Sequence, residues 1–112
     1  MKKNLGEMEH KYKVRMMKLK PSLIGLDGIA LSCGESPLFD GKEIIREPDG
    51  LMFDPSTMTL YNIEYKLHYS TSSRGRAKKQ LRDCSRLLGD IFDDWKIKNL
   101  YIYDNYSIEE IK

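Results

Sequence analysis

The chain has 112 residues, of which 40% are hydrophobic, and this is enough for one small core but not for two ordinary domains. Residues 1–112 are therefore expected to form a single domain. The net charge of +2 excludes a strongly acidic or strongly basic protein. No apolar run approaches the roughly 20 residues of a membrane span, and the N-terminus lacks the apolar stretch of a signal peptide, so we expect a soluble, cytoplasmic protein.

The first predicted element is a helix over residues 4–19. Its apolar residues at helical spacing are Leu5, Met8, Tyr12, Met16 and Leu19. Pro21 would end this helix. A strand is the alternative, because Tyr12, Val14 and Met16 also alternate with basic residues. Residues 21–42 are rich in glycine and proline and predict turns around a short apolar piece at residues 29–31.

Two strands are predicted next. Residues 43–53 read as a strand interrupted by Pro48-Asp49-Gly50, because proline has no amide hydrogen to donate to a ladder. Residues 54–57 predict a turn. The second strand alternates apolar residues (Tyr61, Ile63, Tyr65, Leu67) with polar ones (Asn62, Glu64, Lys66, His68). Successive side chains of a strand point to opposite faces, so Glu64 and Lys66 share one face.

A polar loop (69–76), a helix (about 76–92) and a strand (100–103) follow, and a short helix is expected at the end of the chain. The predicted apolar stripe of the second helix consists of Ala77, Leu81, Cys84, Leu88 and Ile91. The order helix, strand, strand, helix, strand predicts an α/β fold with a mixed β-sheet flanked by helices.

Two carboxylates and a lysine on the two predicted strands suit the hydrolysis of phosphodiesters. Asp49 and Glu64 could hold one divalent cation between adjacent strands, with the backbone carbonyl of Tyr65 as a third ligand, because Mg²⁺ prefers oxygen ligands. Lys66 would orient or deprotonate the attacking water, or stabilise the charge that develops on the phosphate. The tripeptide Asp/Glu-x-Lys occurs five times in the chain, so the prediction rests on its context. Only the Glu64 copy has a strongly alternating strand, an upstream Pro-Asp and a basic helix downstream.

With these residues, the chain resembles the PD-(D/E)XK nuclease superfamily over roughly residues 43–103. That superfamily includes restriction endonucleases, archaeal Holliday-junction resolvases and RecB-like nuclease domains. In the resemblance, Asp49 would be the aspartate of the motif, Glu64 its second acid and Lys66 its lysine. The resemblance implies a restriction-endonuclease-like core, which is a helix, a run of three strands, a helix and a further strand. It also implies a deoxyribonuclease that depends on Mg²⁺ or Mn²⁺.

The resemblance suggests two further site residues. RecB-like members carry a glutamine on the helix after the lysine and a tyrosine four residues later. Gln80 matches the glutamine and is a candidate catalytic residue, whereas Cys84 stands where the tyrosine would be. Many members add an acid from the first helix, which makes Glu9 the candidate for an additional metal ligand, with Glu47 as an alternative.

Basic and hydroxyl-bearing residues after the second strand are the predicted DNA contacts. They are His68, Ser73, Arg74, Arg76, Lys78, Lys79 and Arg82. Such groups bind the phosphate backbone with salt-dependent, mostly sequence-independent affinity. The tyrosines at 61, 65, 101 and 103 are interpreted as sheet core rather than as stacking platforms for bases. DNA is the expected partner and RNA stays open, as does assembly into a homodimer or a larger nucleic-acid-processing complex.

Two other functions fit parts of the pattern. A non-catalytic nucleic-acid-binding or assembly module on the same fold would keep the basic surface, but its Asp49 and Glu64 would not share an ion. A protein-interaction domain, in which the charged residues only solvate the sheet, predicts neither a metal effect nor nucleic-acid binding. The presence of all three motif residues favours the nuclease.

Overall fold

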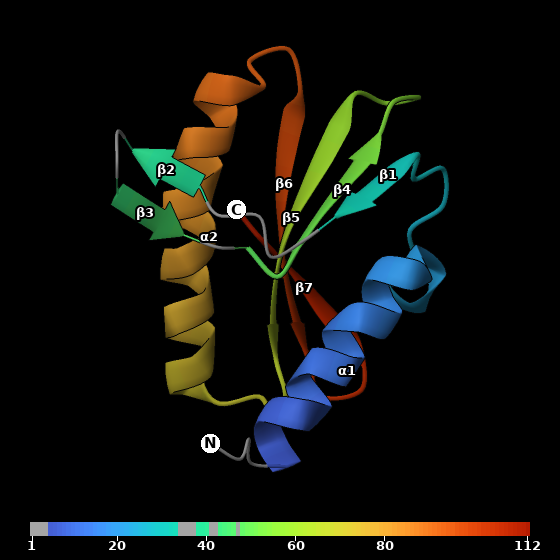
Figure 1. The fold of residues 1–112 in the computed structure, drawn as a ribbon, viewed down its shortest axis with the longest axis vertical. Helices are drawn as coiled ribbons and strands as arrows, with labels where there is room; N and C mark the ends of the chain where they lie inside the picture. The colour runs from blue at the N-terminus through green and yellow to red at the C-terminus, as the bar shows by residue number, and fades with distance from the viewer. Residues whose placement is uncertain (1–4, 34–37, 41–42, 47) are drawn as a thin grey trace.

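The chain forms an α/β fold in which a five-stranded mixed sheet lies between two helices (Figure 1). This computed structural model describes residues 5–33, 38–40, 43–46 and 48–112. In spatial order the strands of the sheet are β1 (Leu31–Cys33), β4 (Gly50–Asp54), β5 (Thr59–Lys66), β6 (Lys96–Tyr103) and β7 (Ser107–Ile111). Neighbouring strands are antiparallel except β5 and β6, which are parallel. A separate two-stranded sheet pairs β2 (Leu38–Asp40) with β3 (Glu43–Arg46).

The two helices cover opposite faces of the main sheet. Helix α1 (Leu5–Leu19) packs Val14 and Met17 against Ile63 on one face, and a short 3-10 helix, η1 (Pro21–Ile24), follows it. Helix α2 (Thr71–Ile91) links β5 to the parallel strand β6 and packs its buried side chains against the other face. Strand β5 is therefore covered on both sides, and even Asn62 is fully buried. In the described part of the chain, neither helix offers an apolar stretch long enough to cross a bilayer.

The helix predicted over residues 4–19 is confirmed, but the predicted inner face is wrong. Leu5, Tyr12 and Leu19 are exposed, whereas Val14 and Met17 are buried. The close approach of α1 to the sheet explains this choice of face. A Cβ atom on Gly50 would lie only 3.3 Å from the terminal methyl carbon of Met17.

The predicted polar loop over 69–76 is wrong, because α2 already begins at Thr71. Ser70 is its N-cap, and the Ser70 hydroxyl accepts a hydrogen bond from the backbone N–H of Ser73 at 3.0 Å. Serine is among the residues preferred at this position because its oxygen satisfies a free amide of the first turn. The run of hydroxyl-bearing residues therefore starts the helix. At the other end, Ile91 was predicted in the apolar stripe and is exposed.

The mixed sheet between helices is confirmed, while the predicted order of elements is incomplete. In the main sheet the order is α-β-β-β-α-β-β, so the prediction missed β1 and β7. The single strand predicted over 43–53 is two strands, β3 and β4, in different sheets. The expected C-terminal helix is strand β7. Asp104 and Tyr106 adopt positive φ values in the preceding turn, which allows the chain to reverse and pair with β6.

The packing of α2 gives a first testable prediction. Leu88→Ala is expected to lower the free energy of unfolding by about 3 kcal/mol, because Leu88 is fully buried and its truncation leaves a cavity. Ile91→Ala is the matched control on the same helix. Ile91 is 59% exposed, so its truncation should cost less than about 0.5 kcal/mol. Urea unfolding of both variants measures the difference, and equal losses would contradict this packing.

Candidate active site

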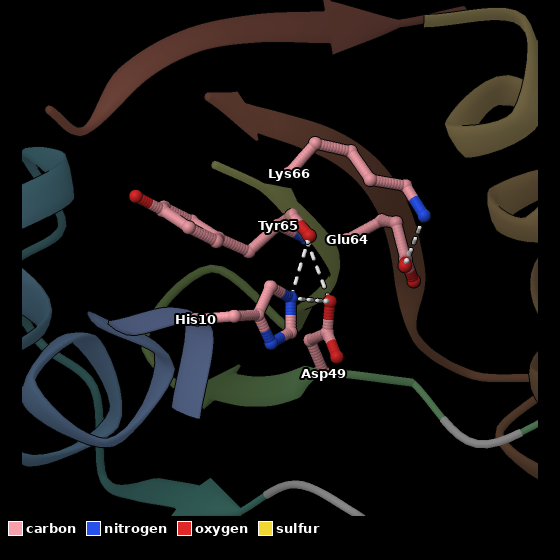
Figure 2. Close-up of polar contacts among 5 residues, drawn as sticks. All are labelled: His10, Asp49, Glu64, Tyr65 and Lys66. Carbon is pink, nitrogen blue, oxygen red and sulfur yellow. Dashed lines mark hydrogen bonds and ion pairs between the residues drawn. The ribbon is translucent and has the colours of Figure 1, made fainter. Parts of the chain in front are cut away.

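The candidate site lies where β5 continues beyond the start of β4. The last pair of this ladder is Gly50 with Ile63, so Tyr65 has no partner residue on β4. Pro48 precedes this point and has no amide hydrogen with which to extend the ladder. The carboxylate of Asp49 takes the place of a strand partner, and its Oδ2 accepts a hydrogen bond from the Tyr65 N–H at 2.8 Å (Figure 2). The interruption at Pro48-Asp49 thus fixes an acid against the backbone of β5.

Glu64 and Lys66 lie on the same face of β5, as their spacing predicted. The Lys66 Nζ is 3.5 Å from Glu64 Oε1. The side chain of Glu64 is 11% exposed and that of Lys66 is 24% exposed. Figure 2 shows both side chains directed to the same side of the strand. The face of β5 that carries Glu64 and Lys66 is therefore not a solvent-exposed polar surface, because Glu64 is buried beside Lys66.

Burial raises the pKa values of both carboxyl groups, and the negative charge of Asp49 raises that of Glu64 further. The pKa of Glu64 is raised to about 8, first because burial desolvates its charge and then because Asp49 is negative beside it. Lys66 partly offsets this shift. Burial also raises the pKa of Asp49, although the Tyr65 N–H and His10 favour its charged form. The two acids are thus close enough to influence each other, and without a cation the pair resists carrying two negative charges.

His10 is a site residue that the sequence reasoning missed. Its Nε2 lies 2.9 Å from the carbonyl oxygen of Tyr65 and 3.7 Å from Asp49 Oδ2 (Figure 2). A carbonyl oxygen only accepts hydrogen bonds, so Nε2 carries the proton in this contact. The available signal was its spacing, because His10 lies four and seven residues before Val14 and Met17, which form the buried face of α1.

The oxygen atoms at this point fit a hard divalent cation. Asp49 and Glu64 supply carboxylates, and the Tyr65 carbonyl faces Asp49 and His10 at the unpaired edge of β5. Mg²⁺ is commonly bound through one or two carboxylates, with waters and substrate phosphate completing its coordination. Within the described residues, no three His, Cys, Asp or Glu side chains are grouped to hold a metal ion. The donor set therefore suits Mg²⁺ or Mn²⁺ better than a closed zinc site.

The other candidate site residues are placed differently. Glu9 is exposed on α1 and acts electrostatically on the hydroxyl group of Tyr65. Because successive helix residues are turned by about 100°, the orientation that brings His10 to Asp49 directs Glu9 elsewhere. Gln80 is half-buried on α2, and its Oε1 is buried with no hydrogen-bond partner among the described residues. Glu47 lies outside the described residues.

The predicted DNA contacts fall into two groups. His68, Arg76, Lys79 and Arg82 are exposed, whereas Ser73, Arg74 and Lys78 are half-buried. All except His68 belong to α2. Arg74 is fixed by Glu109 of β7, since its Nε donates to Glu109 Oε1 at 2.9 Å and its Nη2 to Oε2 at 2.5 Å. The basic residues therefore line a rigid helix that starts beside the carboxyl end of β5.

Comparisons of the chain with models of protein families, with curated proteins and with solved structures find no match. The assignment to the PD-(D/E)XK superfamily accordingly remains a prediction from the residues, and the geometry of Asp49, Glu64 and Lys66 is the basis for a functional proposal.

Proposed function

We propose that the protein is a metal-dependent nuclease that hydrolyses phosphodiester bonds in DNA, with Mg²⁺ or Mn²⁺ as its cofactor. One observation carries the proposal. Asp49, directly before β4, and Glu64 of β5 hold their carboxyl groups close enough for Asp49 to raise the pKa of Glu64, and Lys66 lies 3.5 Å from Glu64. Two buried negative charges close together destabilise a folded protein. A site that places two carboxyl groups in this way is therefore a candidate functional site.

Each residue of the site has a separate role in the proposed hydrolysis. Asp49, Glu64 and the Tyr65 carbonyl would hold the cation, which supplies positive charge to the phosphate and acidifies water. Lys66 is placed to act on the water or on the phosphate. A neutral amine there accepts the proton of the attacking water, and an ammonium stabilises the charge that builds up on the phosphate oxygens. The water oxygen forms a bond to phosphorus as the bond from phosphorus to the leaving oxygen breaks.

The order of elements and the basic helix give further support. In the main sheet, the first six elements follow the order α-β-β-β-α-β, which is the order that the resemblance to the nuclease superfamily implies. Helix α2 carries Arg76, Lys79 and Arg82 on exposed positions, where they can contact phosphates. So small a chain leaves specificity to the shape of the nucleic acid, to a second copy or to a partner.

The proposal is tested by incubating labelled single-stranded, double-stranded and branched DNA with the protein and Mg²⁺, Mn²⁺ or EDTA. Cleavage with either metal and none with EDTA is the expected result. The Asp49→Asn protein, purified in the same way, controls for contaminating nuclease. If the wild type cuts no substrate but binds DNA in a salt-sensitive way, the chain is a binding module. If it neither cuts nor binds, the charged residues serve another role.

A further inference from the structure

Three tyrosines cluster beside the candidate site. The ring centroids of Tyr69 and Tyr103 lie 5.1 Å apart, and those of Tyr101 and Tyr103 lie 4.9 Å apart. Tyr101 is fully buried and forms the base of the cluster, which agrees with its predicted place in the core. Tyr69 differs, because 49% of its surface is exposed although its ring packs on two others. An aromatic ring held in place and half open to solvent is a stacking surface.

The register of the sheet places this surface next to the reacting groups. Lys66 of β5 is directly opposite Tyr103 of β6, and Glu64 is opposite Tyr101. Residues in register on adjacent strands point to the same face, and their backbones lie about 4.8 Å apart. Tyr101 and Tyr103 therefore lie on the strand next to Glu64 and Lys66, on the same face and at the same end of the sheet. A phosphate at Lys66 would have its neighbouring nucleotide at Tyr103 and Tyr69.

Two contacts fix the position of Tyr69 before any ligand arrives. Its backbone N–H donates a hydrogen bond to Asp104 Oδ1 at 3.0 Å. Arg74, one turn into α2, is close enough to Tyr69 for the two side chains to interact electrostatically, and Glu109 binds its Nε and Nη2 atoms. Among the described residues Glu109 contacts only Nε and Nη2 of Arg74, which leaves the hydrogens on Nη1 for a phosphate, since a guanidinium has five N–H donors. The cluster thus combines an aromatic face with a positioned cation.

We infer that Tyr69, supported by Tyr103 and flanked by Arg74, is a stacking site for one unpaired nucleobase next to the Glu64–Lys66 site. The inference rests on the proposed function and narrows its substrate class to single-stranded nucleic acid. Base–aromatic stacking is a general device for binding single strands, because every base has a π-face. A base inside a duplex already has both faces covered by its neighbours, and taking it out of the stack costs energy.

Binding without cleavage tests this site. Fluorescence anisotropy in EDTA would compare a labelled single strand, the same strand with one abasic residue at successive positions, and the matched duplex. Tyr69→Ala is expected to weaken single-strand binding about 10-fold and to leave duplex binding unchanged. Tyr69→Trp should retain the affinity. The control is Tyr12→Ala, because Tyr12 is 61% exposed on α1 and has no ring contact with the cluster.

The abasic series decides whether stacking is the cause. In the wild type, loss of one particular base should weaken binding about as much as Tyr69→Ala does, and in Tyr69→Ala that loss should have no further effect. Equal abasic penalties in both proteins, or equal losses on single strand and duplex, would overturn the stacking site even if DNA is cleaved. A coupled penalty in a protein that cuts nothing would support the stacking site and reject the nuclease. Absence of binding to every nucleic acid would reject both.

Discussion

Lys66→Ala should lower the rate of DNA cleavage at least about 100-fold, because its Nζ is the basic group nearest to the paired carboxyls, 3.5 Å from Glu64 Oε1. The loss follows from either role of the amine, since removal of a proton acceptor or of a charge stabiliser raises the barrier to reaction. Single-turnover cleavage with saturating Mg²⁺ measures the rate. Affinity for DNA should change only a few-fold, because in the proposed complex most phosphate contacts would come from α2.

Two companion variants separate the roles of Lys66 from a general effect of lost charge. Lys96→Ala removes an exposed lysine at the opposite end of the sheet, where β6 starts, and should cleave DNA at the wild-type rate. Lys66→Arg keeps the positive charge, but a guanidinium does not give up its proton near neutral pH. If Lys66 accepts the proton of the attacking water, the arginine variant should be as slow as the alanine variant. If Lys66 only stabilises charge, it should recover much of the rate. Cleavage by Lys66→Ala at the wild-type rate would remove this residue from the site.

The pattern of β5 was the most predictable part of the site. The strict alternation of apolar and polar residues from Tyr61 to Lys66 predicted the strand. It also predicted that one face would be apolar, which is the face that packs on α1, and that Glu64 and Lys66 would share the other. The hydrogen bond from the Tyr65 N–H to Asp49 could not be predicted from the pattern of a single strand. It depends on where the ladder between β4 and β5 ends, and this register is a property of two strands together.

The misplaced parts of the site share one physical cause. Helix α1 has apolar residues on two faces, and the sequence does not say which one meets the sheet. The stripe with Leu5 and Tyr12 contains more apolar residues, yet Val14 and Met17 are buried, and the missing side chain of Gly50 leaves room for Met17 against the sheet. The choice of face directs His10 to Asp49 and leaves Glu9 exposed. At about 100° per residue the predicted stripe and the buried face lie roughly 170° apart on α1, so the error in helix rotation placed Glu9 at the site in place of His10.

Strands β1 and β7 were missed because neither segment carries a clear strand pattern in its own residues. The three residues of β1 pair with β4, about twenty positions further along the chain, and three residues carry almost no periodic signal. The segment Ser107–Ile111 contains two glutamates, which favour helix locally. Pairing with β6 after the turn at Asp104 overrides that preference, and Ile111 is buried as a result.

Glu64→Gln is expected to stabilise the metal-free protein by several kcal/mol at pH 8, although it should abolish cleavage. The reason is the pKa of about 8 in the folded state against an ordinary value of 4.5. Between these values the folded protein holds a proton that the unfolded chain has released, so stability falls as pH rises, by roughly 1.4 kcal/mol per pH unit. Below about pH 4.5 both states are protonated and the penalty is absent. Burial of Asp49 raises its pKa and acts in the same direction.

Urea unfolding from pH 5 to pH 9 in EDTA measures this dependence. The stability of the wild type should decline up to about pH 8 and level off above it, while the curve of Glu64→Gln should be much flatter, because the amide does not titrate. Glu110→Gln, an exposed position on β7, should follow the wild-type curve. Parallel curves for wild type and Glu64→Gln would contradict the burial of a charge at this position.

Addition of Mg²⁺ at pH 8 should stabilise the wild type more than Glu64→Gln, since a cation that binds the folded state relieves the repulsion that the substitution removes. The buried charge of Glu64 thus lowers the stability of the metal-free protein, and relief of this unfavourable free energy would favour the binding of a metal ion at the site.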